Sequence, residues 1–149
     1  MIYTAFLVLH SWLRWIALAL ILVSIVLAAM KDNGPRAQKL SLLTMISYDF
    51  QLLVGLLLYA ALSPVTKTAF ADFGAAMKDS AIRFFAVEHI FGMIIAVALV
   101  HVGHALSKRA ADAAGAAKKR LIFFGLALLV TFLSIPWPFY AAARPLFRF

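Results

Sequence analysis

The sequence predicts an all-α membrane protein, a four-helix transmembrane up-and-down bundle that forms a single domain over residues 1–149. Hydrophobic residues make up 65% of the chain and charged residues only 13%, whereas a soluble domain is about half apolar and about a quarter charged. Four apolar stretches stand out, each of about 20 residues or more, which is long enough to cross a hydrocarbon core about 30 Å thick. Lysine and arginine gather between these stretches, as they do at the ends of membrane helices.

The four spans are expected at about 3–30, 40–62, 82–107 and 121–140. An Asn-Gly-Pro turn follows the first span. Pro64 ends the second span, because proline lacks an N–H donor and biases the residue before it away from the helical conformation. The connector 66–80 mixes charged and aromatic residues, which favours a short helix at the membrane interface. A Pro-Trp-Pro sequence that starts at Pro136 closes the fourth span.

The basic residues also predict the orientation of the chain. The connectors at 31–39 and 108–120 together carry eight Lys and Arg residues, while the opposite side carries five. Because cytoplasmic loops carry the excess of Lys and Arg, both termini are expected outside. The first apolar stretch lacks a basic n-region and is too long for the h-region of a signal peptide, so we expect it to stay as the first span.

Several classes of protein are excluded or disfavoured. The net charge of +8 does not indicate a nucleic-acid partner, because the basic residues lie at the ends of apolar stretches; the expected partner is the lipid bilayer. The absence of cysteine excludes disulfides, thiolate metal sites and covalent attachment of haem. No G-x-S-x-G, H-E-x-x-H or phosphate-binding glycine loop is present, so hydrolytic chemistry is the least expected.

Ionisable residues within a span are costly and therefore suggest function. His10 and His89 each lie seven residues from the outer end of their spans, roughly 10 Å deep. In an up-and-down bundle the first and third helices run parallel and face each other diagonally across the core. Two imidazoles at one depth can bind opposite faces of one haem iron, for which neutral imidazole is a suitable ligand. We therefore predict one haem, with His10 and His89 as its metal ligands.

Small and polar residues surround these two histidines on the helical faces. Gly92 and Met93 share a face of the third span with its histidine, and Tyr48, Gln51 and Gly55 form one stripe on the second span. The glycine of that stripe is level with the histidines, so we expect it to let a porphyrin approach the backbone, with the tyrosine and glutamine as hydrogen-bonding groups. The alternative interpretation is that the small residues mark close helix packing.

Charged residues in the spans suggest further roles. Arg14 and Asp49 are candidates for an ion pair within the bilayer, because charges there generally pair with one another. Arg14 is also a candidate contact for a haem propionate, although Arg83 at the outer boundary is better placed for that role. His101 and His104 lie about 28 Å or more from the outer boundary. Being three residues apart on one helix, they cannot bind opposite faces of a second haem.

Five segments carry a resemblance to a known family: His10–Trp15, Gln51–Tyr59, Ala75–Ser80, Arg83–His89 and Ile135–Phe139. They resemble a family of small four-helix bacterial membrane proteins, common in Bacteroidetes-type bacteria and described as cytochrome b-like, over nearly the whole chain. The resemblance implies haem b, with His10 and His89 at the positions of the family's histidines, and a multi-pass protein of the bacterial inner membrane. Di-haem b cytochromes are loosely similar in architecture but use more histidines, and this chain departs from them.

The leading hypothesis is therefore a b-type cytochrome that transfers electrons in the membrane with a quinol, a periplasmic electron carrier or a membrane redox complex. A single haem near the outer surface cannot carry electrons across the bilayer alone, so a quinone, a partner subunit or a homo-oligomer is implied. Two alternatives stay open: a non-catalytic structural subunit of a larger membrane complex, and a proton- or ion-conducting protein that uses the ionisable groups of the spans. Whether the protein is an enzyme also stays open.

Overall fold

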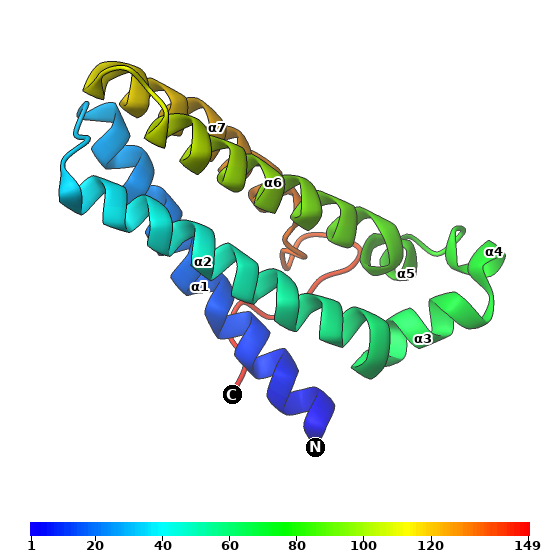
Figure 1. Ribbon diagram of the computed structural model, residues 1–149. Helices are drawn as coiled ribbons and strands as arrows, with labels where there is room; N and C mark the ends of the chain where they lie inside the picture. Colours follow the sequence, from blue (N-terminus) through cyan, green and yellow to red (C-terminus); the bar gives the residue numbers. More distant parts are fainter.

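Four long helices run along the molecule in the computed structural model, which describes residues 1–149 (Figure 1). They are α1 (Ile2–Ala29), α2 (Pro35–Leu57), α6 (His89–Lys108) and α7 (Ala113–Ser134), and the chain contains no strand. Helix α1 packs against α2 and α7, while α6 packs against α7 and α2. Helices α1 and α6 therefore lie diagonally opposite each other, as the first and third helices of an up-and-down arrangement do.

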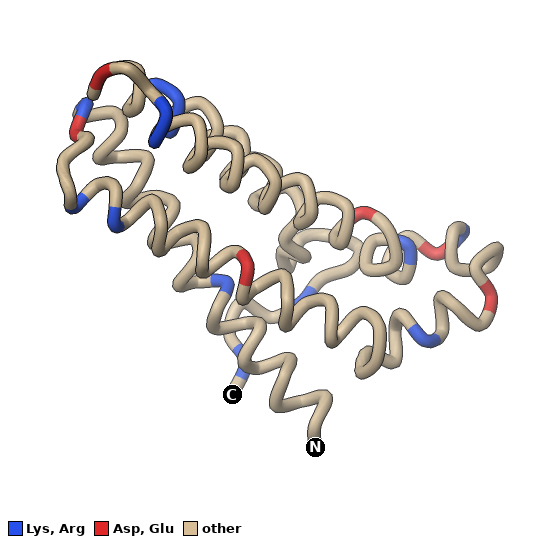
Figure 2. Tube along the Cα trace, in the orientation of Figure 1, with Lys and Arg blue, Asp and Glu red and all other residues tan.

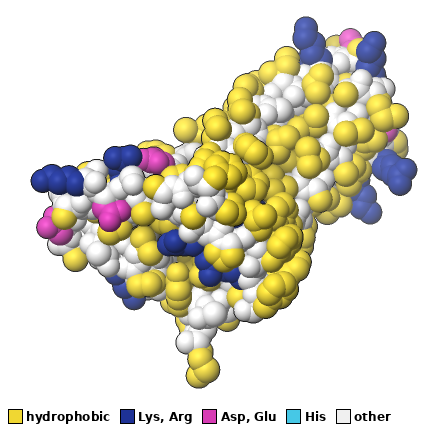
Figure 3. Space-filling model, turned by 180° about the vertical axis from the view of Figure 1, so that it is seen from behind, with side chains coloured by type: hydrophobic (Ala, Val, Ile, Leu, Met, Phe, Trp, Pro, Cys, Tyr) yellow, Lys and Arg dark blue, Asp and Glu magenta, His cyan; other side chains and the backbone are white.

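Three helical segments are long and apolar enough to cross a membrane: Ile2–Ala29, Pro35–Leu62 and Ser80–Lys108. Large apolar side chains such as Phe50 and Phe91 are more than half exposed on them. Hydrophobic side chains cover much of the molecular surface in Figure 3, and Figure 2 shows few charged residues along the middle of the long helices. Because so apolar a surface requires lipid as its solvent, the chain is a membrane protein.

The fourth expected span differs most from the structure. Helix α7 ends at Ser134, so the expectation that the helix would reach Tyr140 is wrong. Pro136 is the physical reason, because the residue before a proline is pushed out of the helical conformation. That residue, Ile135, is extended (φ −76°, ψ 133°). The apolar part of α7 after Arg120 is thus shorter than the about 20 residues that a complete span needs.

The connectors differ from the expectation in smaller ways. Helix α2 begins at Pro35 rather than near residue 40, since proline is favoured at the first position of a helix. The connector 66–80 was expected to hold one short helix and instead contributes to two, α3 (Pro64–Ala71) and α4 (Phe73–Ala76). A further turn of helix, α5 (Ser80–Arg83), leads into the third long segment.

Two π-helical turns interrupt the long segments: η1 (Leu58–Leu62) continues α2, and η2 (Phe84–Glu88) precedes α6. In such a turn a backbone N–H reaches the carbonyl five residues back, as the Ser63 N–H does in η1 (2.8 Å). The Tyr59 hydroxyl in η1 donates a hydrogen bond to the Ala86 carbonyl in η2 (2.8 Å). The two turns are therefore tied together, and π turns of this kind occur frequently at functional sites.

Glycines allow α6 and α7 to approach closely. A Cβ on Gly92 would overlap the Oγ of Ser134, and a Cβ on Gly103 would lie 2.7 Å from the Cβ of Phe123. Small residues of this kind let helix backbones pack tightly inside membranes. The result fixes α6 against α7 in both position and rotation.

The C-terminal segment 135–149 does not continue away from the molecule but returns to α1 (Figure 1). The indole N–H of Trp12 donates to the Arg148 carbonyl (2.9 Å), and that of Trp15 donates to the Leu146 carbonyl (3.1 Å). The Phe147 ring stacks on Trp15, with centroids 5.3 Å apart. We call this segment the C-terminal strap.

Candidate functional site

A cavity of about 150 Å³ lies among α1, α2, η1, α6 and the C-terminal strap. Seven of the residues that the sequence singled out line it: His10, Arg14, Tyr48, Gln51, Gly55, His89 and Met93. They come from three helices that are far apart in the sequence, and the diagonal placement of α1 and α6 brings the two histidines to facing walls. The cavity is thus the place where most of the candidate residues meet.

The two histidines lie close together in this cavity. The ring centroids of His10 and His89 are 6.2 Å apart, and the ring planes make an angle of 76°. Nδ1 of His89 lies 2.6 Å from the Ser134 carbonyl oxygen. A carbonyl only accepts hydrogen bonds, so this nitrogen carries the proton, and in a neutral ring Nε2 is then an unprotonated acceptor. No hydrogen bond occupies that second nitrogen.

His10 is oriented by α2. The Gln51 amide nitrogen donates to the His10 backbone carbonyl (3.0 Å) and lies 3.3 Å from Nε2 of the ring. Nδ1 of His10 is buried and has no hydrogen-bond partner. Gly55 lies against the ring: a Cβ there would be 3.1 Å from Cε1 of His10. The glycine was expected to make room for a porphyrin, but in this structure the space that it leaves is taken by the imidazole.

The π turn η2 leads directly into His89. Turn η2 ends at Glu88, and the His89 N–H still bonds to the Phe84 carbonyl five residues back. The rings of Phe84 and Phe85 flank the imidazole, with centroids 6.0 and 6.2 Å away. Because the turn inserts one extra residue before α6, it rotates the preceding segment relative to the helix without moving His89 off the Ser134 contact.

Tyr48 and Met93 line the cavity as expected, but Gly92 does not. The Tyr48 hydroxyl and Thr131 Oγ1 are hydrogen-bonded at 3.1 Å, which links α2 to α7. Gly92 packs against Ser134 on the α7 side instead and is absent from the cavity lining. The expectation that it contacts a cofactor is therefore wrong, and close helix packing explains this glycine.

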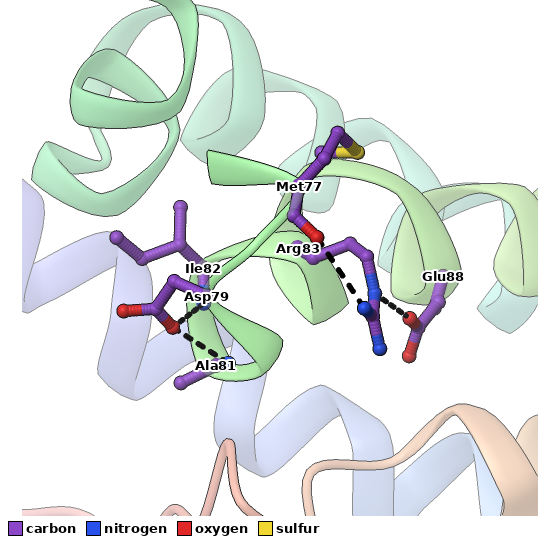
Figure 4. A network of polar contacts seen from close by, with 6 residues as sticks. All are labelled: Met77, Asp79, Ala81, Ile82, Arg83 and Glu88. Atoms are coloured by element: carbon purple, nitrogen blue, oxygen red, sulfur yellow. Dashed lines mark hydrogen bonds and ion pairs between the residues drawn. The ribbon is translucent and has the colours of Figure 1, made fainter. Parts of the chain in front are cut away.

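Arg83 does not line the cavity either. Its Nε donates to the carboxylate of Glu88 (2.8 Å), and a second nitrogen lies 3.4 Å from the Met77 carbonyl (Figure 4). The same view shows Asp79 capping α5 through the N–H groups of the next turn. Because its charge is already paired outside the cavity, the expected role of Arg83 at the cofactor edge does not fit the structure.

The expected ion pair between Arg14 and Asp49 is absent. Arg14 donates to the Leu146 carbonyl of the C-terminal strap, and its guanidinium lies over the Trp15 ring at 4.9 Å. Asp49 pairs instead with Nε2 of His101 (2.7 Å), with both side chains nearly half exposed.

The second pair of histidines is separate from the cavity. Nδ1 of His104 and Oγ of Ser41 are hydrogen-bonded at 2.9 Å, while His101 binds Asp49. The structure holds no cluster of three or more His, Cys, Asp or Glu side chains that could bind a metal ion.

Two residues that line the cavity were not predicted from the sequence. Arg144 and Arg148, both in the C-terminal strap, line the cavity. The guanidinium of Arg144 lies over the Phe85 ring at 4.6 Å. Their only sequence signal is a basic, aromatic chain end that follows a proline-terminated helix, and that pattern does not say where the end packs.

No protein-family model matches this chain, and no curated protein and no solved structure matches it either. The fold and the cavity are therefore described from the geometry of this structure alone.

Proposed function

We propose that this protein is a b-type cytochrome that binds one haem b through His10 and His89 and transfers electrons in the membrane. In this proposal α1, α2, α6 and α7 form a four-helix transmembrane bundle in a bacterial inner membrane, with both termini outside. The redox partner is a quinol, a periplasmic electron carrier or a membrane redox complex.

The separation of the two imidazoles carries the proposal. Metal–imidazole bonds are about 2 Å long and the ring centroid lies about 1 Å behind the bonded nitrogen, so two imidazoles on opposite faces of one metal have centroids about 6 Å apart. The centroids of His10 and His89 are 6.2 Å apart. Packed T-shaped rings also have centroids about 4.5–7 Å apart, so the proposal rests on this distance together with the open nitrogen of His89, Nε2, which no hydrogen bond occupies.

The donor chemistry of the site also fits haem. His89 offers an unprotonated nitrogen, Nε2, that no hydrogen bond occupies, and the only hydrogen-bond contact of the His10 ring is that between its Nε2 and the Gln51 amide nitrogen, 3.3 Å away. The contact of His89 with the Ser134 carbonyl is the kind of outer hydrogen bond that orients a ligating imidazole and raises its basicity. Two protein ligands suffice for haem, because the porphyrin supplies the other four nitrogens, which accounts for the lack of a three-residue metal cluster.

Haem b would supply a one-electron carrier at this place. The chain's own residues hold the ligands in register: α7 fixes His89 through Ser134, and α2 fixes His10 through Gln51. The apolar surroundings keep water out and lower the local dielectric, which tunes the reduction potential. A site near one membrane surface exchanges electrons with a partner at that surface.

The incomplete fourth span fits the bundle if the C-terminal strap completes the outer half of the membrane. Helix α7 ends at the level of His89 through Ser134, and the strap follows. Irregular backbone is tolerated at membrane depth only where protein groups satisfy it. The carbonyls of Leu146 and Arg148 accept hydrogen bonds from Trp15 and Trp12, which supports a strap lying within the membrane.

The test is a reduced-minus-oxidised spectrum of the detergent-purified protein. The wild type should give a low-spin b-type spectrum, and His10→Ala and His89→Ala should each abolish it. His101→Ala is the matched control, because it removes a histidine of the same helix outside the cavity and should leave the spectrum unchanged. A folded, colourless wild type would contradict the proposal.

The contact between Asp49 and His101 favours proton conduction as a second candidate function. This contact joins α2 and α6 within two candidate membrane spans and stays nearly half exposed, and ionisable groups at such positions often belong to proton pathways. Proton flux into liposomes that disappears with Asp49→Asn would support this function. Flux equal to that of protein-free liposomes would exclude it.

A further inference from the structure

The charges around the cavity do not balance. Arg14, Arg144 and Arg148 line it together with the two histidines, and no Asp or Glu side chain does. The two ion pairs of the structure, Arg83 with Glu88 and His101 with Asp49, lie elsewhere. Charges at membrane depth normally pair with opposite charges or with backbone carbonyls. This cavity has three guanidinium groups and no carboxylate.

Backbone contacts satisfy these arginines only in part. Arg14 donates to the Leu146 carbonyl, but its Nε is buried without a partner. Arg144 donates only to the adjacent Ala143 carbonyl (3.0 Å), and no hydrogen bond occupies the side chain of Arg148. A carbonyl dipole accepts a hydrogen bond without neutralising a charge, so the three positive charges remain without a counter-ion.

The C-terminal strap places its two arginines beside the histidine pair. Arg144 lies over Phe85 at 4.6 Å, and the Phe85 ring is 6.2 Å from His89. Arg14 lies one helical turn from His10 on α1. All three arginines line the same cavity as the two imidazoles.

Guanidinium groups recognise carboxylate and phosphate oxygens, often through two parallel hydrogen bonds. A ligand that bridges the two imidazoles and carries two carboxylates on one edge would satisfy both the histidines and the arginines. A porphyrin with two propionates has this combination, whereas a lipid phosphate would engage the arginines alone.

We propose that Arg14, Arg144 and Arg148 form a binding site for the two carboxylates of the porphyrin, and that the C-terminal strap is the part of the chain that closes over the ligand. This inference rests on the proposed function. It assigns to the chain end the role that the sequence suggested for Arg83.

The experiment compares iron protoporphyrin IX with its dimethyl ester, which keeps the macrocycle and iron but has no carboxylate. Both are titrated into the apoprotein, and the low-spin spectrum and the dissociation constant are measured. The wild type should bind both as low-spin species but the ester about 100-fold more weakly, because removing each of two charge-assisted hydrogen-bonded pairs weakens binding about tenfold. The ester titration needs no variant, so it does not depend on the folding of one.

The Arg144→Gln/Arg148→Gln double variant should bind the acid about as weakly as the wild type binds the ester, and it should discriminate little between the two. Arg83→Gln is the control, because that arginine is paired with Glu88 outside the cavity; its affinity for the acid should match the wild type. Equal, low-spin binding of acid and ester by the wild type would overturn the arginine site alone and assign the arginines to another anion, such as a lipid phosphate. A wild type that binds neither porphyrin would overturn the proposed function as well.

Discussion

Gly55 is the residue that decides how closely α2 approaches the His10 ring. A Cβ at this position would lie 3.1 Å from Cε1 of the imidazole, which is closer than the about 3.5–4.0 Å at which carbon atoms pack without repulsion. We predict that Gly55→Val displaces the ring and abolishes the low-spin spectrum, while Gly55→Ala lowers haem retention severalfold. The ratio of haem to protein after purification measures both effects.

Gly125 offers the matched control for that substitution. A Cβ there would meet nothing within 4 Å, so Gly125→Ala should leave haem content unchanged and stabilise the helix by about 0.5–1 kcal/mol through the lower backbone entropy of alanine. Full haem content in Gly55→Val would mean that His10 does not rest against α2 when the ligand is bound.

Among single residues, the sequence predicted those whose position follows from depth alone. His10 and His89 lie together because two parallel helices place equal offsets at equal depth, and the structure puts their centroids 6.2 Å apart. Whether they bind haem stays a prediction. Arg144 and Arg148 could not be found in this way, since their place depends on a return of the chain that no local periodicity encodes.

At the scale of elements, the contact of α6 with α7 positions one wall of the site. A Cβ on Gly92 would overlap Ser134 Oγ, and the carbonyl of the same serine accepts the hydrogen bond from His89. We predict that Gly92→Ala separates the two helices and destabilises the protein by about 1–3 kcal/mol, the usual cost of overpacking. Thermal unfolding in detergent measures this loss of stability.

The double variant Gly92→Ala/Ser134→Ala distinguishes steric overlap from other causes of the destabilisation. Removing the serine hydroxyl eliminates the closest clash, so the double variant should recover part of the stability, and the two substitutions should not be additive. Additive effects would contradict the proposed overlap and point to an effect within α6 itself.

The elements themselves were predicted where long apolar runs determine them. The first three spans lie within a few residues of the expected bounds, because a helix is the way an apolar segment satisfies its backbone in lipid. The fourth was wrong at its end because Pro136 stops the helix before the apolar run stops. No residue pattern in the sequence marks the π turns η1 and η2, because a π turn adds one residue to a helical turn without calling for a particular residue type.

At the scale of the whole molecule, the shape follows from two helix pairs and a strap. Helix α1 packs with α2, and α6 packs with α7, and the pairs meet through α1 with α7 and α2 with α6. The cavity lies at the end of the molecule that holds His10 and His89, among α1, α2, α6 and the C-terminal strap. Arg120, buried at the other end, donates to the Asp32 carbonyl (2.6 Å) and to Oδ1 of Asn33 (2.9 Å), which ties α7 to the connector between α1 and α2.

The orientation of the long helices in the membrane can be tested with single cysteines, because the chain has none of its own. If the positive-inside rule holds, Ala111→Cys in the connector between α6 and α7 faces the cytoplasm, and Ala75→Cys in α4 faces outward. Both positions are exposed. A membrane-impermeant maleimide should label the α4 cysteine in intact cells or spheroplasts, and the other cysteine only after the membrane is permeabilised.

Phe149→Cys tests the fourth span in the same assay, since the C-terminal residue is also exposed. If α7 and the strap together cross the membrane, this cysteine is labelled from outside, like the one in α4. Labelling of Phe149→Cys only after permeabilisation, together with labelling of Ala75→Cys from outside, would mean that α7 turns back without crossing, whereas protection under both conditions would place the strap within the bilayer beside Trp12.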